Sequence, residues 1–205
     1  SKTTVASTGI DLSDTFAFTG TVTGASNLVK LSTVTISGTD TTNIDFDSLF
    51  TTDYDIYKFY FDRVTSITDN AKLYVRFFTS AGIITASDYV HLASSATRQL
   101  SNDSSGNTYN AGEGAFMRVN SASGTNNDDQ YAMNYEFTLI NPLNTTSYKQ
   151  IKFLSSSISS DHDHYYTNQG TGFYKQTTAL RGVRFYFDTG NWKEPSSATM
   201  YGVKK

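Results

Sequence analysis

The stretch MNYEFTL, residues 133–139, decides the fold class of this chain. Its odd-numbered positions are all apolar, and its even-numbered positions are all polar. An alternation with a period of two places the apolar side chains on one face of a β-strand. The stretch VRFYF, residues 183–187, alternates as cleanly. Both stretches therefore predict strands that bury one face.

Similar strand patterns recur along the chain from residue 27 onward, with turn-forming residues between them. No helical period of 10–15 residues separates them, which disfavours a parallel βαβ fold. The expected strands cover residues 27–36, 42–46, 55–64, 71–78, 88–92, 115–119, 131–140, 150–158, 173–176, 182–188 and 199–203. We predict an all-β fold, an antiparallel two-sheet β-sandwich of the jelly-roll type, in which 55–64 pairs with 71–78.

The composition supports this fold and excludes several functional classes. The 205 residues include 25 Ser, 30 Thr and only three Glu, a mixture that suits strands and turns rather than helices. The formal net charge of -3 argues against nucleic-acid binding, and the absence of Cys removes disulfides and thiolate chemistry. No apolar run has the length of a membrane span, and no signal peptide is recognisable.

The first 26 residues differ from the remainder of the chain. They are polar, with scattered apolar residues, and Phe16, Phe18 and Val22 would share one face of an extended segment. We predict that residues 1–26 form an extended N-terminal arm that docks to another chain, and that residues 27–205 form the sandwich domain. The alternative is a frayed terminus whose alternation is accidental.

Three long polar segments are expected to be loops: residues 93–114, 121–130 and 155–172. Long polar loops in a compact domain often carry function. The third loop contains His162 and His164, each preceded by an Asp. Spacing supplies only two convergent imidazoles, whereas a zinc site needs three or four ligands. We therefore interpret this segment as a solvated polar turn and predict neither a metal site nor a cofactor.

No catalytic signature is present. Glu136 lies in the middle of a strand, on its polar face, and none of the 16 Asp and three Glu is marked as a catalytic acid. The three His have no strand–GxSxG–helix context, and no phosphate-binding or dinucleotide fingerprint occurs. We predict that the chain is not an enzyme.

Sugar binding is easier to support, because it needs aromatic faces beside amides and carboxylates. The expected loops and turns present aromatic residues with Asn and Asp close by in the sequence. The candidates for contact with a glycan are Tyr109, Tyr131, Tyr165, Tyr166 and Trp192. The alternative is that these rings cover the ends of the sandwich or pack against a neighbouring subunit.

Motifs in several parts of the chain resemble a known protein family. The stretches RGVRFYFDTGN and SATMYGVK resemble the closing hairpin of a virion β-domain found in tail fibre and tail proteins of tailed phages, including marine cyanophages. The stretches DYDIYKFYF and AKLYVRF resemble the opening strands of the same domain, and FTGTVTG resembles a segment that precedes it. These motifs occupy residues 181–191, 197–204, 53–61, 71–77 and 18–24.

This resemblance implies a jelly-roll structural protein of a bacteriophage virion. Such a protein is assembled in the host cytoplasm and is exposed on the surface of the particle. We expect a tail fibre or receptor-binding protein that contacts a host surface glycan, is attached to other virion proteins by residues 1–26 and, by analogy, is a homotrimer. The alternative is a capsid decoration or head-fibre protein. A polysaccharide depolymerase is disfavoured, because no distinctive carboxylate pair is present.

Overall fold

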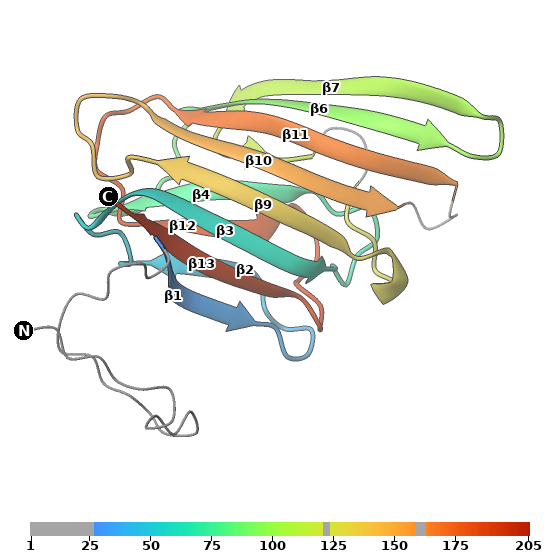
Figure 1. Cartoon of the computed structure of the whole chain (residues 1–205), viewed down its shortest axis with the longest axis horizontal. Coiled ribbons are helices and arrows are strands. Elements are labelled where there is room, and N and C mark those ends of the chain that lie inside the picture. The colour runs from blue at the N-terminus through green and yellow to red at the C-terminus, as the bar shows by residue number, and fades with distance from the viewer. Residues whose placement is uncertain (1–26, 121–123, 159–162) are drawn as a thin grey trace, which may run out of the picture.

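The computed structural model describes residues 27–120, 124–158 and 163–205, which form two antiparallel β-sheets packed face to face (Figure 1). This arrangement confirms the prediction of an all-β sandwich. The expected arm, with Phe16, Phe18 and Val22, lies outside the described residues. No helix in the described ranges is long and apolar enough to cross a membrane.

The large sheet has eight strands and the small sheet has five. In spatial order, the large sheet consists of β1 (Leu28–Thr35), β13 (Ser197–Lys204), β3 (Tyr54–Val64), β9 (Met133–Ile140), β10 (Lys149–Ile158), β11 (His164–Tyr174), β6 (Tyr89–Gln99) and β7 (Ser104–Gly114). The small sheet consists of β2 (Asn43–Asp47), β12 (Gly182–Phe187), β4 (Leu73–Thr79) and β5 (Gly82–Ile83), with β8 (Met117–Arg118) also paired to β4. A short 3-10 turn, η2 (Asp129–Tyr131), precedes β9.

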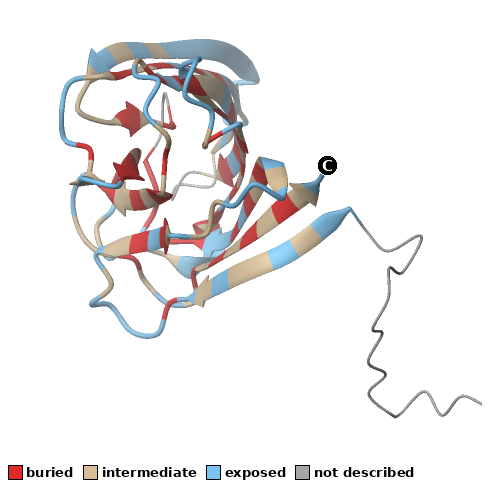
Figure 2. Cartoon of the chain, turned by 90° about the vertical axis from the view of Figure 1, so that its left-hand side faces the viewer, coloured by how far each residue is buried: buried red, intermediate tan, exposed pale blue. Residues whose placement is uncertain are grey.

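The core lies between the sheets and is rich in aromatic rings. Buried and exposed positions alternate along the strands, as the colour bands in Figure 2 show. Phe185 of β12 lies at the centre, with ring centroids 5.6 Å from Phe59, 4.6 Å from Phe61 and 4.9 Å from Phe137. Because Phe59 and Phe61 are on β3 and Phe137 is on β9, this cluster joins the small sheet to the middle of the large one.

The predicted pairing of residues 55–64 with 71–78 is wrong. β3 pairs with β13 and β9 in the large sheet, whereas β4 pairs with β12 in the small sheet. The connection between them crosses the end of the sandwich, where the main-chain N–H of the buried Thr65 donates a 3.0 Å hydrogen bond to the Ser196 hydroxyl oxygen. β12 and β13 also lie in different sheets, so they do not form a closing hairpin.

Two of the predicted polar loops are in fact strands. Residues 93–114 belong to the β6–β7 hairpin, which turns at residues 100–103, and most of 155–172 belongs to β10 and β11. These strands are polar on their inner side as well, but the buried polar groups are paired. Ser95 donates a 2.7 Å hydrogen bond to Asn168, and Asn168 donates a 3.2 Å bond to Ser155. In the remaining predicted loop, 121–130, residues 124–128 precede the short η2 turn, and residues 121–123 lie outside the described ranges.

Gly170 of β11 allows the large sheet to pack closely at this point. A Cβ atom at this position would overlap the Leu92 carbonyl oxygen and the ring of Phe153. Gly106 of β7, by contrast, has no atom within 4 Å of the corresponding position.

We therefore expect Gly170→Ala to destabilise the fold by about 1–3 kcal/mol, because the added methyl group forces the neighbouring strand to shift. Gly106→Ala is the matched control and should leave stability unchanged or raise it by up to about 1 kcal/mol. Urea unfolding at equilibrium measures both values. Equal stability of the two variants would contradict the close packing at Gly170.

His91 of β6 is buried beneath the large sheet, with its Nε2 atom 2.8 Å from the Asn110 side-chain oxygen. Burial lowers the pKa of His91 from its ordinary value of 6.5, and the Asn110 hydrogen bond only partly opposes this effect. The folded state therefore favours the neutral imidazole.

The unfolded chain takes up a proton at His91 near pH 6.5, before the folded chain does. We therefore expect the contribution of His91 to be constant above pH 6.5 and to be lost as the pH falls, by at most about 1.4 kcal/mol at pH 5.5. The His91→Gln variant should lose less stability than the wild type between pH 7.5 and pH 5.5 in urea titrations. An identical loss in both proteins would show that His91 does not contribute to the pH dependence.

Candidate functional site

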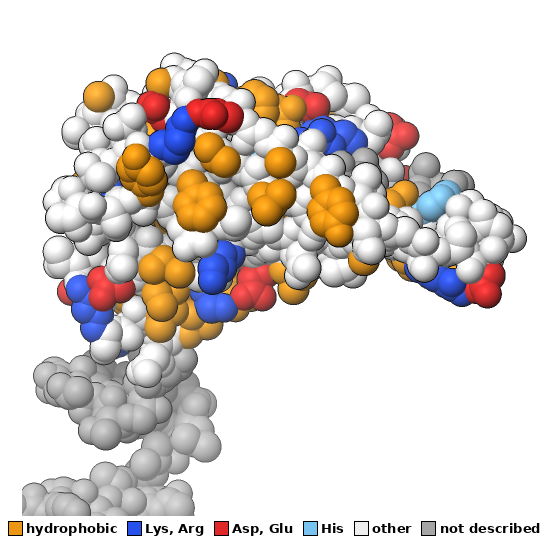
Figure 3. All heavy atoms as spheres, turned by 90° about the horizontal axis from the view of Figure 1, so that it is seen from above, with side chains coloured by type: hydrophobic (Ala, Val, Ile, Leu, Met, Phe, Trp, Pro, Cys, Tyr) orange, Lys and Arg blue, Asp and Glu red, His pale blue; other side chains and the backbone are white. Residues whose placement is uncertain are grey.

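The side of the large sheet that faces away from the small sheet carries most of the exposed large hydrophobic side chains in the described ranges. We call this side the outer face. It presents Leu28, Tyr60, Leu92, Tyr109, Leu154, Tyr165 and Phe173. Seen from the β7 side in Figure 3, the hydrophobic side chains form separate islands among polar ones. A sheet face with this mixture is a candidate interaction surface.

The strand register aligns several of these side chains across the sheet. Tyr60 on β3 and Tyr109 on β7 lie in one cross-strand row, with β9, β10, β11 and β6 between them. Successive partners in this row are Tyr60, Glu136, Leu154, Gln169, Ser94 and Tyr109. The row therefore places an aromatic ring at each end, with polar and aliphatic groups between.

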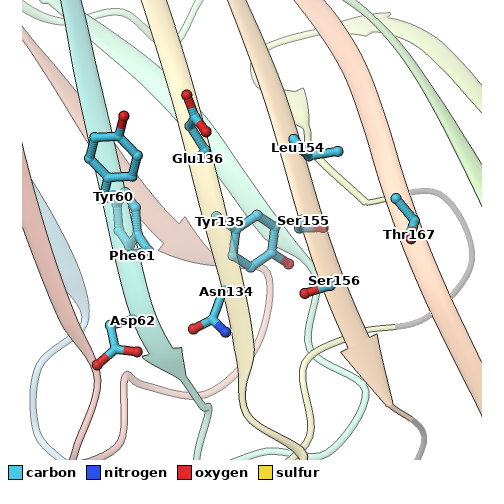
Figure 4. Close-up of a pocket in the computed structure, with 10 residues that line it drawn as sticks. All are labelled: Tyr60, Phe61, Asp62, Asn134, Tyr135, Glu136, Leu154, Ser155, Ser156 and Thr167. Carbon is cyan, nitrogen blue, oxygen red and sulfur yellow. The ribbon is translucent and has the colours of Figure 1, made fainter.

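A depression of about 390 Å³ lies at the Tyr60 end of the row. Figure 4 shows side chains from four neighbouring strands around it. Its outward-facing side chains are Tyr60, Asp62, Asn134, Glu136, Leu154, Ser156 and Thr167. A ligand here would meet one aromatic ring, one aliphatic side chain and several hydrogen-bonding groups.

A second depression, of about 450 Å³, lies at the Tyr109 end. Its outward-facing side chains are Leu92, Ser94, Tyr109, Lys152, Gln169 and Thr171. A smaller hollow of about 180 Å³ shares Glu136 and Leu154 with the first depression and Lys152 with the second. The three together form one shallow depression across five strand spacings, which we call the outer groove.

An ion pair fixes the charge distribution at the Tyr60 end. The Lys58 ammonium donates a 2.8 Å hydrogen bond to Glu136 and lies 5.9 Å from the centroid of the Tyr60 ring. The hydrogen bond with Glu136 raises the pKa of Lys58, and burial only partly opposes this. The Glu136 carboxylate is thus engaged by a cation, whereas cleavage of a glycosidic bond needs a carboxylic acid free to protonate the leaving oxygen.

The outer groove has the chemistry of a sugar-binding surface. Aromatic faces pack against the apolar side of a sugar ring, and amides and hydroxyls pair with its hydroxyl groups. Tyr60 and Tyr109 supply the faces, while Asn134 and Gln169 supply amides.

Two of the predicted glycan-contact residues, Tyr109 and Tyr165, lie on the outer face. Tyr109 is 72% exposed and lines the groove. Tyr165 lies beyond the groove, opposite Arg98. Tyr166 is half-buried and stacks on His164 with the ring centroids 6.1 Å apart.

The remaining two predicted contacts, Tyr131 and Trp192, are buried, so the prediction that they meet a glycan is wrong. Trp192 is fully buried because its loop is held against the end of the sandwich by main-chain hydrogen bonds, including 2.8 Å from its own nitrogen to Thr41. Its indole packs 5.8 Å from Phe61 and 4.6 Å from Phe187, measured between ring centroids.

Sequence reasoning missed Tyr60, Leu92, Lys152, Leu154 and Gln169 as groove residues. A signal for one of them was present. Leu154 occupies an outward position of β10, whose other outward residues are mostly polar. An aliphatic residue on a solvent-facing side of an alternating strand marks a contact surface, once the strand itself has been recognised.

The structure describes one of the two His residues considered as weak metal ligands, His164. His162 lies outside the described residues, and the His164 Nδ1 atom is 3.9 Å from Asp163. Asp163 accepts hydrogen bonds from Ser101 and Gln99, and the Ser101 side-chain bond is the main cause of its lowered pKa. Asp163 therefore holds the β6–β7 turn. Among the residues placed in the structure, no group of three or more His, Asp or Glu side chains is arranged to hold a metal ion.

Comparisons with protein-family models and with curated proteins give no match. Among solved structures, the chain has a weak likeness to the catalytic domain of an endo-1,3-beta-glucanase (laminarinase) from Thermotoga petrophila RKU-1. The sequence identity is 9%, the TM-score is 0.21, and the match covers 80% of this chain and 69% of the other. A likeness at this TM-score carries no argument about fold or function.

The burial of Trp192, the only Trp in the chain, gives a direct test of its placement. We expect the tryptophan emission of the folded protein to be blue-shifted relative to the unfolded chain and to resist quenching by acrylamide, because the indole is out of contact with water. Fluorescence with and without urea measures both properties. If acrylamide quenched the emission of the folded protein as strongly as that of the unfolded chain, the burial would be contradicted and Trp192 would again be a candidate surface contact.

Proposed function

We propose that this chain is a non-enzymatic structural protein of a bacteriophage virion, a tail fibre or receptor-binding protein whose outer groove binds a glycan of the host surface. The observation that carries the glycan part is the outer groove, with Tyr60 and Tyr109 at its ends and amide and hydroxyl groups between them. The virion part is supported by the sequence resemblance alone.

The groove suits a glycan better than a small apolar ligand. It is shallow, and its aromatic and aliphatic side chains are separated by Ser, Thr, Asn and Gln. A drug-sized apolar ligand needs a concave pocket that buries most of its surface. An extended sugar chain, by contrast, keeps one side in water and uses many hydrogen bonds.

In the proposed particle, the sandwich is displayed at the surface, and residues 1–26 attach it to other virion proteins. We extend the proposal to a homotrimer, by analogy with fibre proteins. The alternative remains a capsid decoration or head-fibre protein, in which the outer face has no ligand. A depolymerase would use the groove to cleave the glycan rather than to hold it.

We expect Tyr60→Ala and Tyr109→Ala each to weaken binding to bacterial surface polysaccharides on a glycan array, by about 1 kcal/mol or roughly fivefold. Each substitution removes one ring from the groove without touching the core. Tyr148→Ala is the matched control, because Tyr148 is 60% exposed but lies in the loop before β10, outside the groove. Its binding should equal that of the wild type.

Equal binding by all four proteins would place the glycan elsewhere, and no binding by the wild type would favour the decoration protein. Release of reducing sugar ends from a bound polysaccharide would instead identify a depolymerase.

A further inference from the structure

The middle of the outer groove contains a lysine that the proposed function does not yet use. Lys152 of β10 lines both the second depression and the smaller hollow, and its cross-strand partners are Thr138 on β9 and Thr171 on β11. It is exposed, so its ammonium group is available to a ligand lying in the groove.

The other charges that line the groove are already paired. The register places Glu136 diagonally between Lys58 and Lys152, and Glu136 forms its ion pair with Lys58. Asp62, at the far side of the first depression, lies 3.4 Å from Arg63. Lys152 has no ion pair with any residue that the structure describes, so it is the uncompensated charge of the groove.

We propose that Lys152 binds the carboxylate of an acidic sugar, and that the ligand of the outer groove is an acidic oligosaccharide lying across the strands from Tyr60 to Tyr109. This inference rests on the proposed glycan-binding function and specifies its substrate class. A single ammonium matches the single negative charge of a uronic or sialic acid. A phosphomonoester carries more charge and is usually held by several cationic or main-chain donors.

The register also sets the size of this ligand. The path from Tyr60 to Tyr109 runs over β3, β9, β10, β11, β6 and β7, which is five strand spacings. At about 4.8 Å per spacing the rings are roughly 24 Å apart along the sheet. A mono- or disaccharide cannot reach both rings. The acidic residue that meets Lys152 is an internal one, because β10 lies two strands from Tyr60 and three from Tyr109.

Lys30 of β1 provides a matched control for Lys152. Both side chains are exposed on the outer face, and they lie in the same cross-strand row, which continues from Lys30 through Tyr201, Lys58 and Thr138 to Lys152. Lys30 lies four strands away from Lys152 and lines none of the depressions of the groove. Lys30→Met and Lys152→Met therefore change the net charge equally.

The test measures the binding of hexasaccharides of galacturonic acid, alginate, hyaluronan and polysialic acid by calorimetry, each beside its carboxyl-reduced form. We expect the wild-type chain to bind at least one acidic hexasaccharide ten or more times as tightly as the reduced form. Lys152→Met should lose that tenfold preference while retaining its affinity for the reduced form. Lys30→Met should remain within twofold of the wild type, and the disaccharide of the same series should bind at least tenfold more weakly than the hexasaccharide.

The results that would contradict the inference are the following. Equal binding of acidic and reduced forms, an unchanged Lys152→Met variant, or the same loss in Lys30→Met would overturn the acidic specificity. The glycan-binding function would still stand if Tyr60→Ala weakened the binding of the reduced form. If no hexasaccharide binds in either form, the inference fails, and the binding function is then decided by the glycan array. Tryptophan emission verifies that every variant is folded.

Discussion

The contact of the Phe185 ring with Phe59, Phe61 and Phe137 is the interaction on which the rest of the structure depends. It ties the small sheet to the adjacent strands β3 and β9 of the large one. Because side chains alternate along a strand, packing of an inward ring also fixes the backbone that carries the outward residues on either side of it. Tyr60 lies between Phe59 and Phe61 in the sequence, and Glu136 precedes Phe137. The Tyr60 end of the groove is thus built directly over this aromatic cluster, and a binding surface that is already ordered costs less entropy when a ligand binds.

The Tyr109 end of the groove is supported by a different kind of interaction. Beneath it, the inner side of the large sheet carries the buried Ser95–Asn168–Ser155 hydrogen bonds. Each of these hydrogen bonds adds little to the net stability, but leaving the buried amide unpaired would cost about 1–3 kcal/mol. A shift in the register of β6, β10 or β11 would break these bonds, so the register is well specified. Further out, the first residues of β7 are exposed on both faces. This half of the sheet is therefore held mainly by its own hydrogen-bond ladder.

The same difference explains which parts of the fold could be predicted from the sequence. Residues 133–139 and 183–187 were recognised as strands because one face is apolar, and burial of that face determines the structure. Residues 93–114 read as a loop from the sequence because they are mostly polar, and only the pairing of β6 with β7 and β11 makes them part of a sheet. The polar turn around Trp192 predicts a surface position, yet main-chain hydrogen bonds between this turn and Thr41, Thr65 and Ile67 hold it against the core. Tertiary pairing of this kind leaves no local pattern.

Charge specificity in the groove depends on Glu136 remaining paired with Lys58. Were Glu136 to turn to Lys152 instead, the net charge at the centre of the groove would vanish and Lys58 would be left unpaired at the Tyr60 end. The observed pairing is reinforced by the Tyr60 ring, whose face lies near the Lys58 ammonium and favours a cation there. The hydrogen bond that Lys58 donates to Glu136 raises the pKa of Lys58, so Lys58 keeps its charge to a higher pH than an ordinary lysine. In the proposed complex, Tyr60 therefore has two roles, as a surface for a sugar ring and as a positioning residue that leaves Lys152 available to a carboxylate.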